Sequence, residues 1–203
     1  MTSRVFESKT ILRVFISAIV CIALSLVFLT GCSKVQSLIL SSASQNSDVP
    51  VSEFQEATVV RVVDGDTIIV NYDSSDYKVR LDGIDCPESV HSDETKNTPE
   101  GQMASDFTKS VVASGQTVYL QTDVNTQDKY GRELRYVWLE IPSDGATNDS
   151  ISSLMLNAII VKNGFAEARE WEPNVMYADV LESLEAQARD NNAGVSYYWV
   201  SSN

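Results

Sequence analysis

Histidine, cysteine and positive charge are scarce in this sequence. Its 203 residues include a single histidine, His91, and three cysteines, Cys21, Cys32 and Cys86. One histidine excludes two-histidine acid/base pairs and zinc sites built from several histidines. Three cysteines exclude a cysteine-rich zinc module and a disulfide-stapled scaffold. Any hydrolytic chemistry must therefore rely on carboxylates, on arginines and, where a metal takes part, on one that binds oxygen.

The composition is that of an acidic globular chain. Hydrophobic residues make up 43% and charged residues 21%, which excludes wholesale disorder. There are 15 Lys+Arg against 28 Asp+Glu, and the formal net charge is -13. The length predicts one domain with some additional chain. Such an acidic balance normally argues against a nucleic-acid partner.

The N-terminal segment has the layout of an export signal. Residues 1–13 carry Arg4, Lys9 and Arg13, and residues 14–30 contain no charge. The sequence Leu-Thr-Gly-Cys that ends at Cys32 looks like the lipobox of a bacterial lipoprotein, which implies cleavage before Cys32 and a diacylglyceryl group on its sulfur. The alternative is a transmembrane anchor, but about 17 apolar residues lie at the short limit for crossing a bilayer. We therefore expect an exported protein, lipid-anchored to the extracytoplasmic face of the cell membrane.

Three segments follow from this interpretation. Residues 1–31 form the signal peptide, residues 32–52, rich in Ser, Gln, Asn and Asp, form a tether, and residues 53–203 form the folded domain. Cleavage removes three basic residues and one acidic residue, which leaves 12 basic against 27 acidic residues and a formal charge of -15. Cys86 is then the remaining free cysteine, so no intrachain disulfide is expected.

The folded domain alternates short strands with helices. Runs of β-branched residues predict strands over 56–63, 67–72, 77–84, 117–123 and 133–140. Helices are predicted from Pro99, over 152–163 where Gly164 ends the segment, and over 175–191. Five strands with one helix after the third and two after the fifth indicate a mainly β fold with helices (α+β): an OB-fold, a five-stranded Greek-key barrel with three helices.

Three acidic segments stand out in the domain, although each has an ordinary structural explanation. Residues 64–67 read Asp-Gly-Asp-Thr, which is a common hairpin turn, and residues 80–88 lead from an arginine into Asp-Cys-Pro-Glu, which could be a plain strand end. Residues 128–132 read Asp-Lys-Tyr-Gly-Arg, a β-turn with glycine at the position that needs a positive φ. Taken singly, none of them indicates a site.

Their order and combination, however, resemble the thermonuclease family of staphylococcal-nuclease-like domains. The similarity continues through Pro99-Glu100, residues 156–166 and Pro173-Asn174, and it covers about residues 56–199. The resemblance implies an OB-fold enzyme that binds Ca²⁺ and hydrolyses phosphodiester bonds of DNA and RNA to leave 3′-phosphates.

The resemblance also implies a metal site and a general base. Asp66 and Asp85 would give carboxylate oxygens to Ca²⁺, and Cys86, which stands where the family usually has Thr, would give its backbone carbonyl; an all-oxygen shell suits this ion. Glu88 would be the general base that deprotonates the attacking water. Crowded carboxylates resist ionisation unless a cation offsets them, which is a physical reason for the site to need a metal.

The remaining roles concern the substrate. By the same resemblance Arg80 and Arg132 would clamp the phosphate, because a planar guanidinium can hold two of its oxygens; the alternative is surface ion pairing with nearby acids. Lys129 and Tyr130 would contact a terminal phosphate or a neighbouring nucleotide. Trp171 stands near the place of a base-stacking Tyr of the family, but the spacing differs, and a partly buried aromatic is equally compatible.

The acidic charge and the implied substrate conflict. We expect a local basic cleft, with bound Ca²⁺ supplying part of the attraction for nucleic acid. Two other functions remain compatible with the sequence: a non-catalytic nucleic-acid-binding OB-fold surface lipoprotein, and a structural lipoprotein whose loop acids bind Ca²⁺. The joint presence of Arg80, Glu88 and Arg132 favours the nuclease. Nothing in the sequence indicates more than a monomer.

Overall fold

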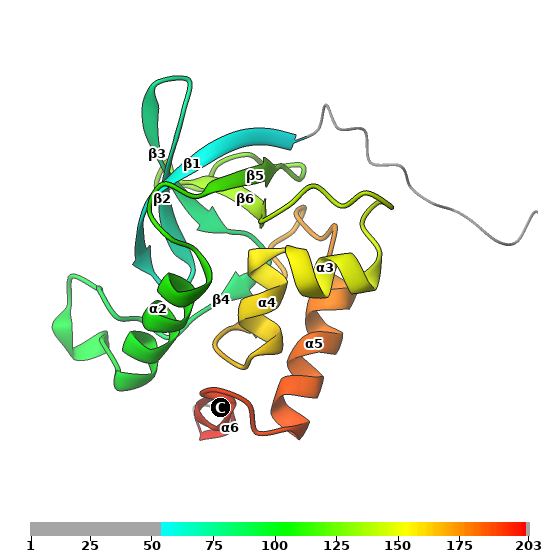
Figure 1. Cartoon of the computed structure of the whole chain (residues 1–203). Coiled ribbons are helices and arrows are strands. Elements are labelled where there is room, and N and C mark those ends of the chain that lie inside the picture. The colour runs from blue at the N-terminus through cyan, green and yellow to red at the C-terminus, as the bar shows by residue number, and fades with distance from the viewer. Residues whose placement is uncertain (1–53, 202–203) are drawn as a thin grey trace, which may run out of the picture. The chain divides into compact units, whose positions relative to one another are not determined.

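The structure, a computed structural model, describes residues 54–201 and forms a closed five-stranded barrel covered by helices on one side (Figure 1). The predicted signal peptide, Cys32 and the tether lie outside the described residues. The barrel strands follow the order β1-β2-β3-β6-β5. Their bounds are β1 Phe54–Asp64, β2 Thr67–Tyr72, β3 Ser75–Leu81, β5 Thr117–Gln121 and β6 Glu133–Trp138. The predicted α+β fold with an OB-like barrel is confirmed.

The barrel forms because one face of each strand is apolar. In β2, Ile68 and Val70 are fully buried and point into the barrel, whereas Ile69 between them is partly exposed. The strands β1, β2 and β3 pair antiparallel in sequence order, and β3 pairs parallel with β6. The antiparallel pairing of β1 with β5 closes the barrel (Figure 1).

The predicted C-terminal end of the third strand, 77–84, is wrong. The strand β3 stops at Leu81, and the chain turns at Asp82, whose buried carboxylate accepts a hydrogen bond from the Gly83 N–H over 3.0 Å. A separate strand β4, Ile84–Asp85, then pairs with β7, Glu167–Ala168. This break turns the segment that carries Asp85 away from the barrel.

The helices are more numerous than the three predicted. Within the described residues they are α2 Pro99–Val111, α3 Asn148–Leu154, α4 Leu156–Lys162, α5 Ala178–Asp190 and α6 Ser196–Ser201, with a 3₁₀ turn η2 over Glu94–Lys96. The predicted helix 152–163 is divided at Met155, because Met155 bridges to Trp138 of β6 and the Leu139 N–H donates to the carbonyl of Leu154. Among the described residues no helix has the length and apolar character needed to cross a membrane.

Helix α2 positions the loop that leads from β4. Thr98 caps it by accepting a hydrogen bond from the Gly101 N–H, and Pro99 begins its first turn. Its buried face consists of small residues, among them Ala104 and Thr108. A Cβ at Gly101 would lie 2.1 Å from the carbonyl oxygen of Glu88. Glycine is therefore required for the helix to approach the backbone of the predicted general base.

Candidate active site

The turn between β1 and β2 holds the Asp66 carboxylate in place. Its Oδ1 accepts a hydrogen bond from the Thr67 hydroxyl over 2.9 Å, and its Oδ2 accepts one from the backbone N–H of Cys86 over 3.0 Å. Helix α2 fixes the turn itself, because the buried Thr108 hydroxyl donates to the carbonyl of Gly65 over 2.7 Å. Asp66 is thus fixed by contacts from segments that are distant in sequence.

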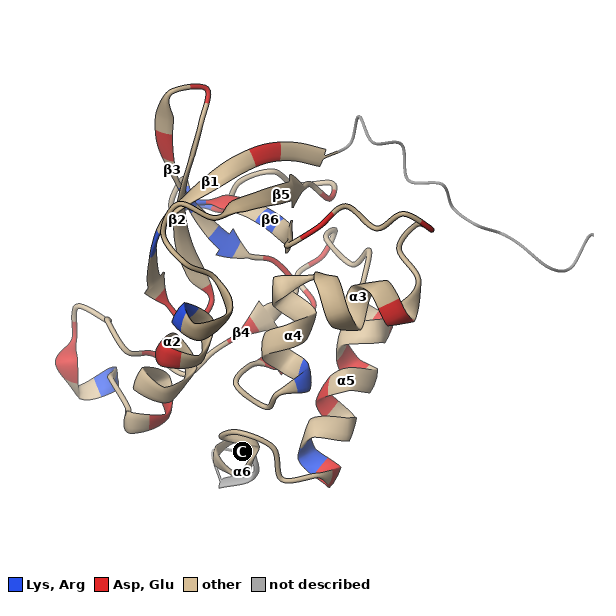
Figure 2. Cartoon of the chain, in the orientation of Figure 1, with Lys and Arg blue, Asp and Glu red and all other residues tan. Residues whose placement is uncertain are grey.

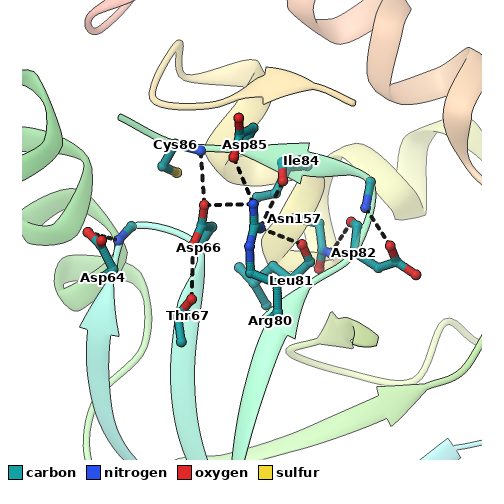
Figure 3. A network of polar contacts seen from close by, with 12 residues as sticks. Asp64, Asp66, Thr67, Arg80, Leu81, Asp82, Ile84, Asp85, Cys86 and Asn157 are labelled. Carbon is teal, nitrogen blue, oxygen red and sulfur yellow. Dashed lines mark hydrogen bonds and ion pairs between the residues drawn. The ribbon is translucent and has the colours of Figure 1, made fainter. Parts of the chain in front are cut away.

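Arg80 lies between the two carboxylates that were predicted to bind the metal (Figure 3). Its Nη2 is 3.0 Å from Oδ2 of Asp66 and 2.8 Å from Oδ1 of Asp85. Its Nη1 donates to the carbonyl oxygens of Leu81 and Ile84 over 2.9 and 2.8 Å. The side chain is 8% exposed. The structure therefore brings Asp66, Arg80 and Asp85 together, and here both terminal nitrogens of Arg80 bind groups of the protein itself.

Glu88 joins this cluster from the segment after β4. The exposed Glu88 lines the same cleft as Asp64, Asp66 and Asp85. Although part of its surface is exposed, the surrounding protein partly desolvates the Glu88 carboxyl; this desolvation, and then the charges of Asp64, Asp66 and Asp85, raise its pKa above the usual range, while His91 acts in the opposite sense. A carboxylate with a raised pKa is a better proton acceptor near neutral pH, which suits the role predicted for it.

The Arg80 guanidinium forms ion pairs with two carboxylates, Asp66 and Asp85. Burial raises the pKa of Asp85, and the charge of Asp66 raises it further, while Arg80 acts in the opposite sense. The Asp64 carboxylate accepts a hydrogen bond from the Ser89 hydroxyl over 2.6 Å. The cluster therefore retains an excess of negative charge that a second cation would offset.

The second arginine comes from the loop between β5 and β6. Gly131 adopts a φ of 76°, which confirms the predicted turn. Asp128 accepts hydrogen bonds from the N–H groups of Tyr130 and Arg132, both over 2.9 Å, and from Nε of Arg132 over 2.6 Å. The ion pair that was the alternative for Arg132 is thus present. Within the described residues the two terminal nitrogens of Arg132 have no partner, and the side chain lines the cleft.

Lys129 and Tyr130 lie at the edge of the same cleft. Tyr130 is 73% exposed, and its ring lies 5.0 Å from Nζ of Lys129 and 5.6 Å from Cζ of Arg132. The aromatic surface and both cations are accessible to solvent. The structure therefore places all of the predicted catalytic and substrate-binding side chains around one cleft.

Trp171 has a position that the sequence left open. Its ring is 43% exposed, lines the cleft and lies 5.3 Å from Cζ of Arg80. This is the geometry of a cation–π contact. The sequence left open whether Trp171 stacks on a base or is partly buried, and the structure places it in the cleft and not in the core.

Two buried polar residues that the sequence did not identify connect the parts of the site. Asn174 donates from Nδ2 to a carboxylate oxygen of Asp82 and to the carbonyl of Asn125 over 2.9 Å, and its Oδ1 accepts from the Asn125 N–H over 2.7 Å. Burial raises the pKa of Asp82. These contacts join the strand end that carries Arg80 to the loop that carries Arg132. The Pro-Asn motif at 173–174 was the available signal.

The residues predicted to hold a metal fit an oxygen-binding cation. Asp66 and Asp85 converge on one point, the Nη2 of Arg80, so that their oxygens lie near each other. No group of three His, Cys, Asp or Glu side chains among residues 54–201 forms a metal site; calcium, however, also takes backbone carbonyls and water as ligands. The thiol of Cys86 is buried, and burial raises its pKa well above the usual value, so that it stays protonated.

The cleft as a whole is not basic, contrary to our expectation. Its carboxylates outnumber its cations. The acidic residues that line it are Asp64, Asp66, Asp82, Asp85, Glu88, Asp128 and Glu172, and the basic residues are Lys78, Arg80, Lys129 and Arg132. Attraction for a phosphate must therefore come from the particular cations that remain unpaired and from a bound metal ion.

Comparison with known proteins places this arrangement in a family. The profile described as "Staphylococcal nuclease homologue" matches residues 78–197. A thermonuclease of Staphylococcus hyicus is 36% identical over 168 residues, which cover 83% of this chain and 86% of the relative. A thermonuclease of Staphylococcus intermedius is 38% identical over 137 residues, covering 68% and 73% respectively. The SPbeta prophage-derived endonuclease YokF of Bacillus subtilis is 32% identical over 144 residues, which cover 70% of this chain and 44% of the relative.

The matched region and the extent of these similarities agree with the motifs, the barrel and the clustered side chains described above. The chain belongs to the staphylococcal nuclease homologue family and is a nuclease.

Proposed function

We propose that this nuclease is a Ca²⁺-dependent hydrolase of phosphodiester bonds in DNA and RNA that leaves 3′-phosphates. The observation that carries the proposal is the convergence of Asp66, Arg80 and Asp85, in one cleft with Glu88 and Arg132. These groups come from three separate stretches of sequence. A cleft that only bound nucleic acid would have no need of an elevated-pKa carboxylate beside two guanidinium groups.

The side chains divide the chemistry between them. Glu88 accepts the proton of a water molecule that attacks phosphorus, and its raised pKa favours this transfer. The terminal nitrogens of Arg132, which have no partner within the described residues, bind phosphate oxygens and stabilise the charge that grows in the transition state. Arg80 keeps the carboxylates of Asp66 and Asp85 together.

Asp66 and Asp85 are the side chains that would hold Ca²⁺, together with the backbone carbonyl of Cys86. When bound, the ion supplies positive charge that offsets the crowded carboxylates and polarises a phosphate oxygen. We also propose that the enzyme is exported and tethered to the membrane through lipidated Cys32, with residues 1–31 removed and residues 32–52 as the tether. The folded domain acts as a monomer.

Hydrolysis of single-stranded DNA and RNA by the purified chain tests the enzymatic proposal. Degradation should require Ca²⁺ and stop with a chelator, and the fragments should carry 3′-phosphates that a phosphatase removes. Glu88→Gln and Arg132→Ala should each abolish most of the activity while the thermal unfolding curve stays close to that of the wild type. Binding without hydrolysis in the presence of Ca²⁺ would instead support the non-catalytic alternative. Incorporation of a labelled fatty acid, lost in Cys32→Ser, tests the anchor.

A further inference from the structure

Two exposed cations lie on the outer face of the barrel. In the register of the first strands, Arg61 of β1 pairs with Ile69 of β2, and Ile69 pairs with Lys78 of β3. Paired residues project from the same face of a sheet. Arg61 and Lys78 are exposed and Ile69 is partly exposed, whereas Ile68 and Val79, their neighbours on β2 and β3, are buried. Arg61, Ile69 and Lys78 thus form one outward row, which we call the basic row.

The basic row is continuous with the cleft. The next outward pair on β2 and β3 is Thr67 with Arg80, both of which line the cleft. Two residues along a strand span roughly 7 Å. Lys78 itself also lines the cleft. A nucleic-acid strand with a phosphate at Arg80 therefore reaches the basic row if it extends by roughly 7 Å along β3.

The cations of this row have no ion-pair partner among residues 54–201. Most cations in this acidic domain do: Arg80, Lys109, Arg132, Arg135, Arg169 and Arg189 each form an ion pair with a carboxylate. Within residues 54–201 neither Arg61 nor Lys78 forms a side-chain hydrogen bond or ion pair. Unpaired cations on a domain with an excess of acid are available to an external anion.

On the outer face of the barrel, the basic row lies between the cleft and the next carboxylate. Figure 2 shows acidic positions along α5 and in the segments around α3, while β1 and β3 carry both acidic and basic positions. On the outer face, the row beyond Ile69 is Thr58, Asn71 and Asp76, and there Asp76 accepts a hydrogen bond from Asn71 over 2.6 Å. The basic row therefore separates the cleft from the next carboxylate on this face.

We propose that the basic row binds the phosphates of a nucleic-acid strand next to the scissile one, so that the strand leaves the cleft across the outer face of β1, β2 and β3. This inference rests on the proposed function, because it extends the same substrate beyond the reacting phosphate. Charge complementarity between two unpaired cations and a polyanion supports it. The partly exposed Ile69 between them offers an apolar contact to a sugar or base, and the strand 2–3 face is a common oligonucleotide-binding face in OB-folds.

Salt-dependent binding of a single strand tests the proposal. Binding of a fluorescent single-stranded DNA by the full chain is measured by anisotropy over a salt series, in a Glu88→Gln background that prevents cleavage. Each lost phosphate contact changes the slope of log K against log salt by about 0.7 for single strands. The Arg61→Gln/Lys78→Gln variant should therefore raise this slope by about 1.4. Lys162→Gln removes an exposed charge from α4, outside the cleft, that forms no ion pair with residues 54–201, and it should leave the slope unchanged.

Cleavage by the otherwise wild-type chain gives a second measurement. The loss of kcat/KM caused by Arg61→Gln/Lys78→Gln should be larger for a long single strand than for a dinucleotide, whose one phosphate is the scissile one and which therefore has no neighbouring phosphate for the row to bind. A slope equal to that of Lys162→Gln, or an equal loss on both substrates, would overturn the proposal. A slope that depends on the row in a chain that binds but hydrolyses nothing would support the row and refute the proposed function instead.

Discussion

Arg132→Ala should lower the catalytic rate strongly while changing the free energy of unfolding only slightly. The Nε of Arg132 is held by Asp128 over 2.6 Å, while its two terminal nitrogens have no partner within the described residues. Such a preoriented guanidinium can bind a phosphate with both terminal groups at no cost in reorganisation. Removing one preorganised donor of this kind costs about 10²–10³ in kcat, or about 2.7–4 kcal/mol of transition-state stabilisation. We expect Arg132→Ala to lose activity by this factor.

The same change should cost little folding free energy. The Arg132 side chain is 29% exposed, and ion pairs at such positions contribute about 0.2–1 kcal/mol. Asp128 would still accept hydrogen bonds from the backbone N–H groups of Tyr130 and residue 132. No buried carboxylate is therefore left without a partner, and the unfolding free energy should change by about 1 kcal/mol or less.

Arg189→Ala is a closely matched control. Arg189 pairs with Glu185 over 2.6 Å, also four residues apart, and the two side chains are 31% and 16% exposed, against 29% and 15% for Arg132 and Asp128. Arg189 also makes a longer ion pair with Glu167 over 3.4 Å. It lies on α5 and does not line the cleft. Hydrolysis of single-stranded DNA and urea unfolding are measured for both variants. Activity retained in Arg132→Ala, or lost equally in Arg189→Ala, would refute the assignment of Arg132 to the phosphate.

Three further predictions concern the base, the barrel and the helix beside the site. Burial and neighbouring acids raise the pKa of Glu88 in the metal-free site, and the base must be ionised, so activity should fall on the acid side and this fall should move to higher pH as Ca²⁺ is lowered; Glu88→Gln should remove the acid-side fall. Burial and the hydrogen bond to Glu133 raise the pKa of Tyr72 to about 12, so the unfolded chain ionises first and stability declines from about pH 10 toward 12. In Tyr72→Phe that part of the alkaline loss, followed by thermal unfolding, should disappear. Gly101→Ala should destabilise the fold by about 1–3 kcal/mol in urea unfolding, because its Cβ would meet the Glu88 carbonyl.

The sequence predicts the barrel well because its strands have a local signal. The run 67–72 is found as β2 with the same bounds, since its β-branched residues fit the pleated, half-buried surface of a strand. The break at Met155 has no such signal. Both halves of 148–162 have helical character, and a bridge to Trp138, which is distant in sequence, divides them. The short pair of β4 and β7 likewise exists only because the tertiary fold brings residues 84–85 and 167–168 together.

The site shows the same division. The family resemblance carried by the motifs predicted a site made of Asp66, Arg80, Asp85, Glu88 and Arg132, and the structure gathers these side chains in one cleft, while their roles stay a prediction. Sequence could not show that Arg80 pairs with both carboxylates, because this depends on distances within the fold. The contact of Asn174 with Asp82 joins residues 92 positions apart, so that neither local pattern nor spacing could reveal it.

The distribution of charge explains how an acidic domain can act on a polyanion. Most carboxylates of the inner cleft are already engaged: Asp66 and Asp85 by Arg80, and Asp64 by Ser89. In the part of the chain that the structure describes, the cleft's cations with free donors are Lys78, Lys129 and the terminal groups of Arg132, and these are accessible at its edge. At physiological ionic strength charges separated by more than about 8 Å are largely screened. A bound phosphate therefore interacts mainly with these nearby cations, and the acidic surface of α5 contributes little beyond slower association at low salt.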